Sequence, residues 1–384
     1  MKPLMVCATL GLTLVLAHCG KTPAPKVSGA LDVTTLGKVA SVESLFTPVD
    51  TLQLETVHAS LIGQVDQIVK HPNGYLILDG HRGRTVFFFD NAGRFIRTLS
   101  RNGQGPGEYQ EPNSVQCDAQ GQIYVLDTRN RKMLIYDAQG LYQDYCGFAH
   151  LGIYPLLFEI VETDAGKRFV FYNLNSTFGR SVENKKFVVT AMEGQAFRIL
   201  NYFGDQEPAG VKLMFSSDGF HIFDATTLFS IDIFDLGVEI FSLDGVLQSR
   251  ITEHADLLPK PHITQETMLA FNRPSESLDT YYTLTRPGRS IFLNDLVLQL
   301  YLSNKRNNSW ILFDKTGRHC PRRIAAQPAS FLGRCRGTVS NRLLTKFQPG
   351  EDDGSPMLNS VLNPQIITYE LEPRSLYLND KNSQ

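Results

Sequence analysis

The sequence predicts an all-β protein with a β-propeller fold, and two observations support this prediction. Short runs of β-branched and aromatic residues are separated by turns rich in Gly, Asp and Asn, which is the pattern of antiparallel strands. One run also recurs, since Tyr75-Leu76-Ile77-Leu78-Asp79 is followed about 48 residues later by Ile123-Tyr124-Val125-Leu126-Asp127. A period of this length, with four strands in each repeat, is typical of propeller blades.

The first two repeats show the order of elements most clearly. In each, a second strand ends in Asp, a polar loop follows, and the third strand leads into an Asp-x-x-Gly turn. The glycines of Gly103–Gly107, between the repeats, lack the spacing and the following helix of a phosphate-binding loop. The strands expected here are Leu61–Val69, Tyr75–Leu78, Val86–Phe89, Phe95–Leu99, Pro112–Val115, Ile123–Leu126 and Met133–Tyr136.

Later repeats diverge, and counting them gives six blades, with seven as the alternative that the chain length would accommodate. The strand Phe46–Leu54 has no hairpin partner nearby, and in a closed ring it would complete the last blade and remove a free sheet edge. The later strands are expected at Leu156–Val161, Arg168–Tyr172, Phe187–Thr190, Phe197–Tyr202, Phe220–Phe223, Leu228–Phe234, Val238–Leu243, Leu247–Ile251, Tyr281–Leu284, Ile291–Tyr301, Trp310–Phe313, Arg318–Arg323, Leu343–Phe347 and Ile366–Leu371.

The N-terminal residues are interpreted as a targeting segment. Leu4–Ala17 is apolar but too short to span a bilayer. It ends in Leu16-Ala17-His18-Cys19-Gly20, which resembles the lipobox of bacterial lipoproteins, although a small residue normally stands where His18 is. An ordinary secretory signal is the alternative. We therefore expect a signal peptide over residues 1–18, lipidated Cys19 with a tether over residues 19–44, and a single propeller domain over residues 45–384.

Two motifs carry a family resemblance. Pro106-Gly107-Glu108-Tyr109-x-x-Pro112, followed by the strand and loop Ile123–Asn130, resembles the NHL-repeat family. The chain is more closely similar to the six-bladed β-propeller lipoproteins of outer-membrane bacteria, a family largely without assigned activity. The match is specific over residues 60–145. The resemblance implies an NHL-like propeller in an outer-membrane lipoprotein, facing the periplasm or the cell surface.

The acids most typical of a functional site are Asp79 and Asp127, which end equivalent strands. A carboxylate at such a place can accept hydrogen bonds from backbone N–H groups of the following loop, which is a structural role. The functional alternative is a ligand site at one mouth of the central channel, where propellers concentrate binding. Its candidate residues are Asp79, Arg82, Asp127, Arg129 and Arg131.

Four cysteines lie beyond the targeting segment, and an exported protein permits disulfides. Cys320 and Cys335 bracket a short Arg-rich segment and form a possible disulfide. Cys117 and Cys146 are expected on an inner and an outer strand of one blade, too far apart to bond.

Two hypotheses for function remain. The net charge of −2 gives no reason to expect nucleic acid, and no cofactor is predicted. The first hypothesis is a lipid-anchored propeller without catalysis that binds an envelope protein, peptide or glycan. The alternative is a metal-assisted lyase or hydrolase in the central channel, because propeller enzymes can collect ligands from different blades. The densest group of potential ligands is His254, His262, Glu253 and Asp256.

Overall fold

The protein is represented by a computed structural model. All the described residues lie in the larger of the chain's two compact units, Leu31–Gln384. None of the described helices is long and apolar enough to cross a membrane. The expected signal peptide, residues 1–18, and Cys19 lie outside the described residues. The described residues are 33–34, 41–173, 185–205, 220–223, 225–232, 236–260, 284–293, 296–303, 308–326, 332, 335–339, 342–347 and 363–371.

The described part of the unit is built from strands arranged in five sheets. Short 3-10 helices lie between some of them: η2 (Val42–Leu45), η3 (His58–Ser60), η4 (Ala149–Leu151) and η5 (Glu253–Leu257). Three sheets are antiparallel and follow chain order, namely β2 (Gln67–His71), β3 (Gly74–Asp79), β4 (Thr85–Asp90) and β5 (Phe95–Thr98); β14 (Phe220–Phe223), β15 (Thr227–Ile231), β16 (Val238–Ser242) and β17 (Leu247–Ile251); and β18 (Arg286–Leu293), β19 (Leu296–Leu302), β20 (Ser309–Asp314) and β21 (Ile324–Ala325).

The fourth sheet closes the arrangement with a strand from the start of the unit. β1 (Phe46–Gln53) pairs antiparallel with β24 (Gln365–Leu371), and β24 is followed in the sheet by β23 (Arg342–Phe347) and β22 (Cys335–Val339). The expected pairing of the N-terminal strand with the last strands is therefore confirmed. This pairing joins the first strand of the unit to the last one, and β1 covers an edge of β24 that would otherwise be free.

The fifth sheet has eight strands and corrects the expected blade count. Its two antiparallel halves are β6 (Pro112–Cys117), β7 (Ile123–Asp127), β8 (Lys132–Tyr136) and β9 (Tyr142–Gly147), and β10 (Pro155–Thr163), β11 (Gly166–Asn173), β12 (Lys185–Glu193) and β13 (Ala196–Asp205). One parallel pair, Ala196 with Gly147, joins β13 to β9. The prediction of six separate blades, or seven, is therefore wrong: the described strands form five sheets, because these two halves share a hydrogen-bonded edge.

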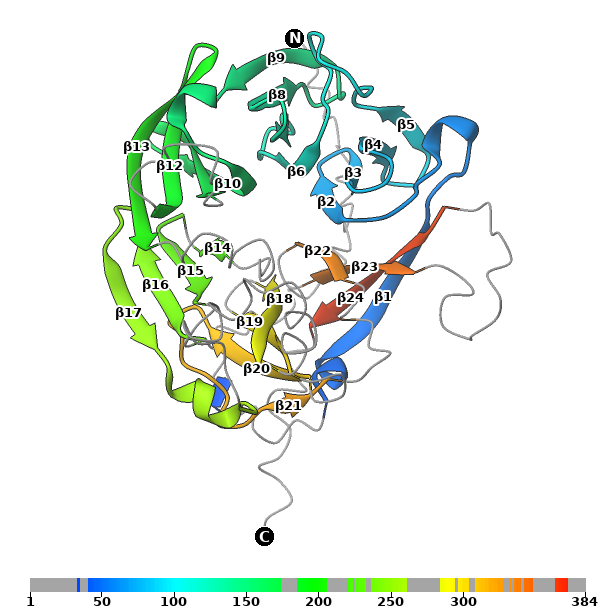
Figure 1. Ribbon diagram of the computed structural model, residues 1–384. Coiled ribbons are helices and arrows are strands. Elements are labelled where there is room, and N and C mark those ends of the chain that lie inside the picture. Colours follow the sequence, from blue (N-terminus) through cyan, green and yellow to red (C-terminus); the bar gives the residue numbers. More distant parts are fainter. Residues whose placement is uncertain are drawn as a thin grey trace, which may run out of the picture. The chain divides into compact units, whose positions relative to one another are not determined.

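Six strands, which we call the inner strands, lie at sheet edges and face the middle of the arrangement in Figure 1: β2, β6, β10, β14, β18 and β22. β2 contacts β6 and β22, β10 contacts β6 and β14, and β18 contacts β22. The rings of His221 on β14 and Phe292 on β18 stack with centroids 4.8 Å apart. The inner strands therefore follow one another in a ring, as in a propeller.

Apolar residues between neighbouring four-strand groups form the core. One cluster, for example, combines Leu76 and Phe88 of β3 and β4 with Val115, Val125 and Leu134 of β6 to β8, all fully or almost fully buried. Burial of such side chains stabilises a fold by about 1.5–3 kcal/mol each. Each group therefore depends on its neighbour for a second apolar wall.

The recurring Asp-x-x-Gly turn packs onto the outer strand of the preceding group. Gly140 has φ 74°, and a Cβ atom there would lie 2.8 Å from Leu99 Cδ2 beside β5. Gly317 has φ 85°, and its Cβ atom would lie 2.1 Å from Ile251 Cδ1 on β17. Glycine is required at both places by backbone conformation and by close approach. The glycine turns predicted from the sequence thus also form contacts between neighbouring four-strand groups.

Candidate functional site

Asp79, one of the predicted site residues, is fully buried at the end of β3. Its Oδ2 accepts hydrogen bonds from the backbone N–H groups of Gly63 at 2.7 Å and Gln64 at 3.1 Å. Its Oδ1 accepts from Arg82 N at 3.2 Å and Gly83 N at 2.7 Å. The carboxylate therefore joins the segment that enters β2 to the loop that leaves β3.

Asp127 has the same role in the next repeat and is also fully buried. Its Oδ2 accepts from Gln110 N at 3.1 Å, and its Oδ1 accepts from Glu111 N at 3.1 Å and Asn130 N at 3.3 Å. The Asn130 side chain donates to Oδ2 at 2.6 Å. Asp79 and Asp127 are thus both buried, and backbone N–H groups occupy their carboxylates.

The arginines of the same loops are placed differently. Arg82 and Arg129 are exposed, and no described residue forms an ion pair or side-chain hydrogen bond with Arg82, Arg84, Arg129 or Arg131. Arg84 and Arg131 occupy equivalent positions before β4 and β8, with φ of 47° and 52°. The left-handed region is uncommon for non-glycine residues. The two loops, residues 80–84 and 128–131, therefore share one turn, and we call them the arginine loops.

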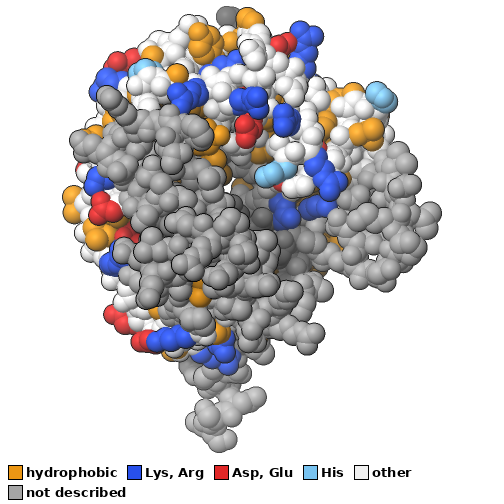
Figure 2. Space-filling view, in the orientation of Figure 1, with side chains coloured by type: hydrophobic (Ala, Val, Ile, Leu, Met, Phe, Trp, Pro, Cys, Tyr) orange, Lys and Arg blue, Asp and Glu red, His pale blue; other side chains and the backbone are white. Residues whose placement is uncertain are grey.

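Two acidic groups beside the arginine loops, Asp66 and Glu108, are engaged within the fold. Asp66 Oδ2 accepts from Gly80 N at 2.8 Å and His81 N at 2.9 Å, and it lies 3.0 Å from His81 Nδ1. Glu108 accepts from Gly105 N at 2.9 Å and pairs with Arg101. Lysine and arginine side chains gather on the upper part of the face shown in Figure 2, where β2 to β9 lie. This part of the unit therefore presents positive charge.

Tyr154 lies between the second arginine loop and β10. Its backbone N–H donates to Asn173 Oδ1 at 2.8 Å, at the strand end that corresponds to Asp79 and Asp127. Burial and the charge of Glu111 raise the pKa of Tyr154, while Arg129 and Arg131 partly offset the rise. Both guanidinium groups therefore act on one partly buried phenol.

The inner strands carry a second set of polar side chains. Gln67 Oε1 on β2 accepts from Val115 N on β6 at 3.0 Å, and Gln116 Nε2 on β6 donates to Phe158 O on β10 at 3.4 Å. Arg336 Nε on β22 donates to Val65 O, just before β2, at 2.8 Å. Each of these side chains reaches the neighbouring group, so the inner strands are linked by polar contacts as well as by packing.

Glu159 on β10 and His221 on β14 are the ionisable members of this set. His221 Nδ1 lies 2.8 Å from Glu159 Oε1, and Ile222 N donates to Glu159 Oε2 at 3.2 Å. The side chain of His221 is 33% exposed and that of Glu159 is 21% exposed. Burial lowers the pKa of His221, but the charge of Glu159 and its hydrogen bond outweigh burial, so that the net pKa is raised. The sequence interpretation missed this pair, although aligning the first strands of the repeats would have placed both residues on inner strands.

The predicted group of potential metal ligands is not assembled in the described part of the chain. His254 is fully buried, and its Nε2 lies 2.7 Å from Leu236 O and 3.0 Å from the Tyr301 hydroxyl. Asp256 pairs with Lys260, and His262 lies outside the described residues. Among the residues that the structure describes, no three His, Cys, Asp or Glu side chains are grouped to hold a metal ion.

The four described cysteines are thiols. Cys117 and Cys146 lie on β6 and β9, the two ends of one four-strand half, which agrees with their expected separation. Cys320 and Cys335 are buried in one apolar cluster. The possible disulfide between these two residues is not formed in the structure.

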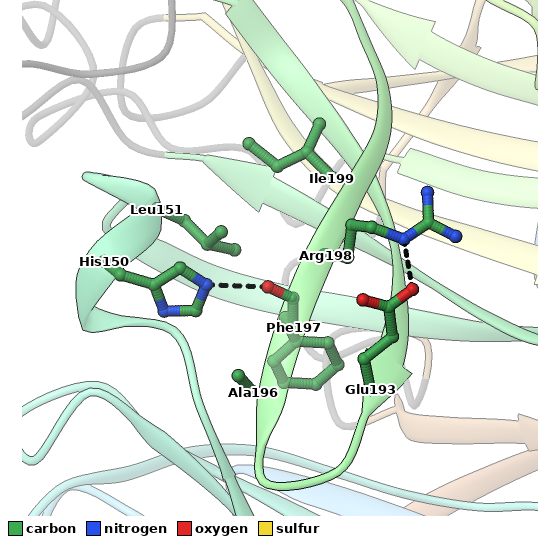
Figure 3. Close-up of a pocket in the computed structure, with 7 residues that line it drawn as sticks. All are labelled: His150, Leu151, Glu193, Ala196, Phe197, Arg198 and Ile199. Atoms are coloured by element: carbon green, nitrogen blue, oxygen red, sulfur yellow. Dashed lines mark hydrogen bonds and ion pairs between the residues drawn. The ribbon is translucent and has the colours of Figure 1, made fainter.

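A groove of about 390 Å³ lies at the outer side, between η4 and the β12–β13 hairpin (Figure 3). His150 Nε2 lies 2.7 Å from Phe197 O, and Arg198 pairs with Glu193. The remaining wall is mainly aliphatic and aromatic. Its polar groups are thus bonded to each other, so the groove offers a ligand less polar recognition than the arginine loops do.

Comparisons with solved structures support the fold. A "Putative exported protein" from Bacteroides fragilis has a TM-score of 0.60 and 17% identity, over 86% of this chain and 97% of that one. A member of the duf4221 family from Bacteroides vulgatus has a TM-score of 0.57 and 8% identity, over 85% and 97%. Similarity at such low identity shows that the chain shares a propeller-like fold with these proteins. It gives no information about activity.

No curated protein matches the sequence significantly. A family model described as "Domain of unknown function (DUF4934)" matches residues 31–320, which is most of the described unit. The specific NHL-like lipoprotein family is not what this model identifies. Because the match covers more than half of the sequence, the chain belongs to the DUF4934 family.

Proposed function

We propose that this protein is a lipid-anchored protein of the cell envelope that binds an anionic partner through its arginine loops. The observation that supports this most is that Arg82, Arg84, Arg129 and Arg131 have no described side-chain partner, while Asp79 and Asp127 behind them are buried and bonded. Such an arrangement leaves positive charge directed to solvent instead of neutralised within the fold.

Guanidinium groups suit a partner that carries carboxylates or phosphates. They are planar, always charged, and form two parallel hydrogen bonds with such groups. Two equivalent loops, each with two arginines, favour a partner with several negative charges over a single small anion. Because the groups are at the surface, binding should weaken as salt screens them. Among anionic partners we favour an acidic glycan, since Tyr154 adds a partly buried ring beside Arg129 and Arg131.

Binding of fluorescent polygalacturonate to the full-length protein tests this proposal. Arg82→Ser, Arg84→Asn, Arg129→Ser and Arg131→Asn should together weaken binding at least tenfold, and asparagine tolerates the left-handed backbone at positions 84 and 131. Arg198→Ser, on the outer hairpin, is the matched control. Neutral dextran should not bind. Equal binding by the fourfold variant and the parent would overturn the proposal, and binding of polyglutamate in place of polygalacturonate would assign an acidic protein segment as partner.

The anchor is a separate part of the proposal. Cys19 ends an apolar targeting segment, and the structural neighbour from Bacteroides fragilis is described as exported. We propose acylation at Cys19 and location at the outer membrane. Cys19→Ala should release the protein into the soluble fraction after cell fractionation. A variant that stays in the membrane fraction would show that the lipoprotein assignment is wrong.

A further inference from the structure

The imidazole of His221 is held in one orientation by three contacts on the inner strands. Its Nδ1 lies 2.8 Å from Glu159 Oε1 on β10. Phe292 on β18 stacks on the ring at 4.8 Å with an interplanar angle of 26°, and Phe223 meets it edge-on at 5.0 Å. Three inner strands, β10, β14 and β18, thus contribute side chains to one small site.

The second ring nitrogen faces solvent. His221 Nε2 has no hydrogen-bond partner among the described residues. It is not one of their buried polar atoms that lack a partner, and 33% of the His221 side chain is exposed. A carboxylate accepts and does not donate, so the neutral imidazole carries its proton on Nδ1. The lone pair is then on Nε2, at the open side of the ring.

Glu159 also stabilises the protonated form of this ring. From the other inner strands, Glu159 bonds to the ring of His221 and Phe292 stacks on it, and Glu159 is the charged one of these two. Its charge and hydrogen bond raise the pKa of His221 despite burial. A histidine whose Nδ1 is held by a carboxylate while its Nε2 is exposed is the arrangement used for general-base catalysis.

We propose that Glu159 and His221 form a general-base site on the inner strands, in which Nε2 removes a proton from water or from a hydroxyl group of a small ligand. In water attack on an ester, the O–H bond of water breaks and an N–H bond forms at Nε2. The water oxygen bonds to the acyl carbon, and the alcohol group leaves with the electron pair of its C–O bond. The proton then passes from Nε2 to the leaving group or to bulk water.

The charge of the pair indicates the class of ligand. With Glu159 ionised and His221 neutral, the site carries one negative charge, which disfavours anionic ligands. A neutral, uncharged acyl or hydroxyl compound is therefore the expected class. The arginine loops, in contrast, favour anionic ligands. The two proposals therefore concern different ligands and different residues, and either can fail without the other.

Hydrolysis of p-nitrophenyl acetate by the full-length protein tests the site, because 4-nitrophenolate leaves readily from this ester and its release can be followed by absorbance. His221→Gln should lose at least fivefold of the protein-dependent rate, while His58→Gln, which changes an exposed histidine on η3, should not. Glu159 is a positioning residue, so Glu159→Gln should shift the pH midpoint of the rate downward. An unchanged rate in His221→Gln, or an unchanged midpoint in Glu159→Gln, would overturn the proposal.

Imidazole nitrogen NMR of the unsubstituted protein gives a result even where a variant fails to fold. Above the pKa of His221, the proton should be observed on Nδ1 and the lone pair on Nε2. A proton on Nε2 would contradict the geometry and sink the general-base assignment.

Discussion

Two regions of the unit hold their strands together with different chemistry. Around Asp79 and Asp127, one buried carboxylate collects backbone N–H groups from segments of its own repeat. Around Lys186 on β12, charges from two sheets meet: Lys186 Nζ lies 3.2 Å from Glu239 Oε2 on β16, and Arg250 on β17 also pairs with Glu239. The side chains of Lys186 and Glu239 are only 2% and 8% exposed.

The difference shows what each arrangement can stabilise. A carboxylate bonded to backbone N–H groups needs no partner from elsewhere and fixes a loop. The ion pairs join strands of separate sheets, but burial costs both charges their hydration. Burial raises the pKa of Glu239 most, Lys186 lowers it, Asp232 raises it and Arg250 lowers it, and the net pKa is raised. The ion pairs therefore do not fully offset the burial of Glu239.

The largest expected effect comes from removing the buried cation. Lys186→Met should lower the free energy of unfolding by about 3 kcal/mol, because it leaves Glu239 with less compensation in a buried place. Urea denaturation measures this. The double variant Lys186→Met with Glu239→Leu should lose less than the single one. If the single variant lost under about 1 kcal/mol, the ion pairs would contribute little to joining the two sheets.

Removing one strand-end carboxylate should cost somewhat less. Asp127→Ala leaves three backbone N–H groups without their acceptor, so we expect a loss of about 2 kcal/mol. Asp79→Ala should lose a similar amount, since its bonds are equivalent. Asp137→Ala, in an exposed turn, is the control for loss of a carboxylate at the surface. A large difference between the first two variants would refute the equivalence of the repeats.

The pH dependence of stability should report the Glu159–His221 pair, with a smaller effect. Since the folded pKa of His221 is raised, its contribution is complete below the unfolded value of about 6.5 and is lost as pH rises through the folded pKa. The stability difference between the parent and His221→Gln should therefore be larger at acidic than at alkaline pH. A difference that does not vary with pH would show that His221 does not bind a proton more tightly in the folded state.

The smallest expected effect concerns the thiols. Cys117 and Cys146 lie in the regular second repeat, and Cys320 and Cys335 lie in the divergent last part of the unit. Burial raises the pKa of Cys117 to about 11 and of Cys146 to about 12, and Cys320 and Cys335 are buried. Native protein should therefore react slowly with Ellman's reagent at pH 8. After unfolding without reductant, all four thiols should react. Loss of two of them, at Cys320 and Cys335, would show that the disulfide forms after all.

The predictability of the fold follows the regularity of the repeats. The Asp-ended strands β3 and β7 and the glycine turns were predicted, because local hydrogen bonds and backbone conformation leave a local signal. Ile291–Tyr301 was predicted as one strand, but its residues belong to the two antiparallel strands β18 and β19, because apolar residues on both sides of positions 294–295 resemble one run. β9 was expected only as the outer strand that carries Cys146, without bounds, and β22 was missed because its burial pattern is mixed.

The arginine loops were predicted correctly as polar loops. The sequence did not predict which side chains in and beside them would be buried and which would be exposed. Sequence alone placed Asp79 and Arg82 together in one candidate site. The structure separates them, since the carboxylate turns inward to backbone donors and no described residue pairs with the guanidinium. Burial of a side chain depends on the packing of the adjoining connector, which carries no pattern of its own.

Residue order thus determined the strands, their turns and the repeating strand-end carboxylate, because each depends on neighbours within one repeat. Tertiary structure alone decided which repeats meet and with which side chains. Glu159 and His221 are 62 residues apart, and Lys186 and Glu239 are 53 apart. The joining of β9 to β13 is of the same kind. Such contacts depend on the distance and angle between neighbouring groups, which are set by how their apolar faces pack.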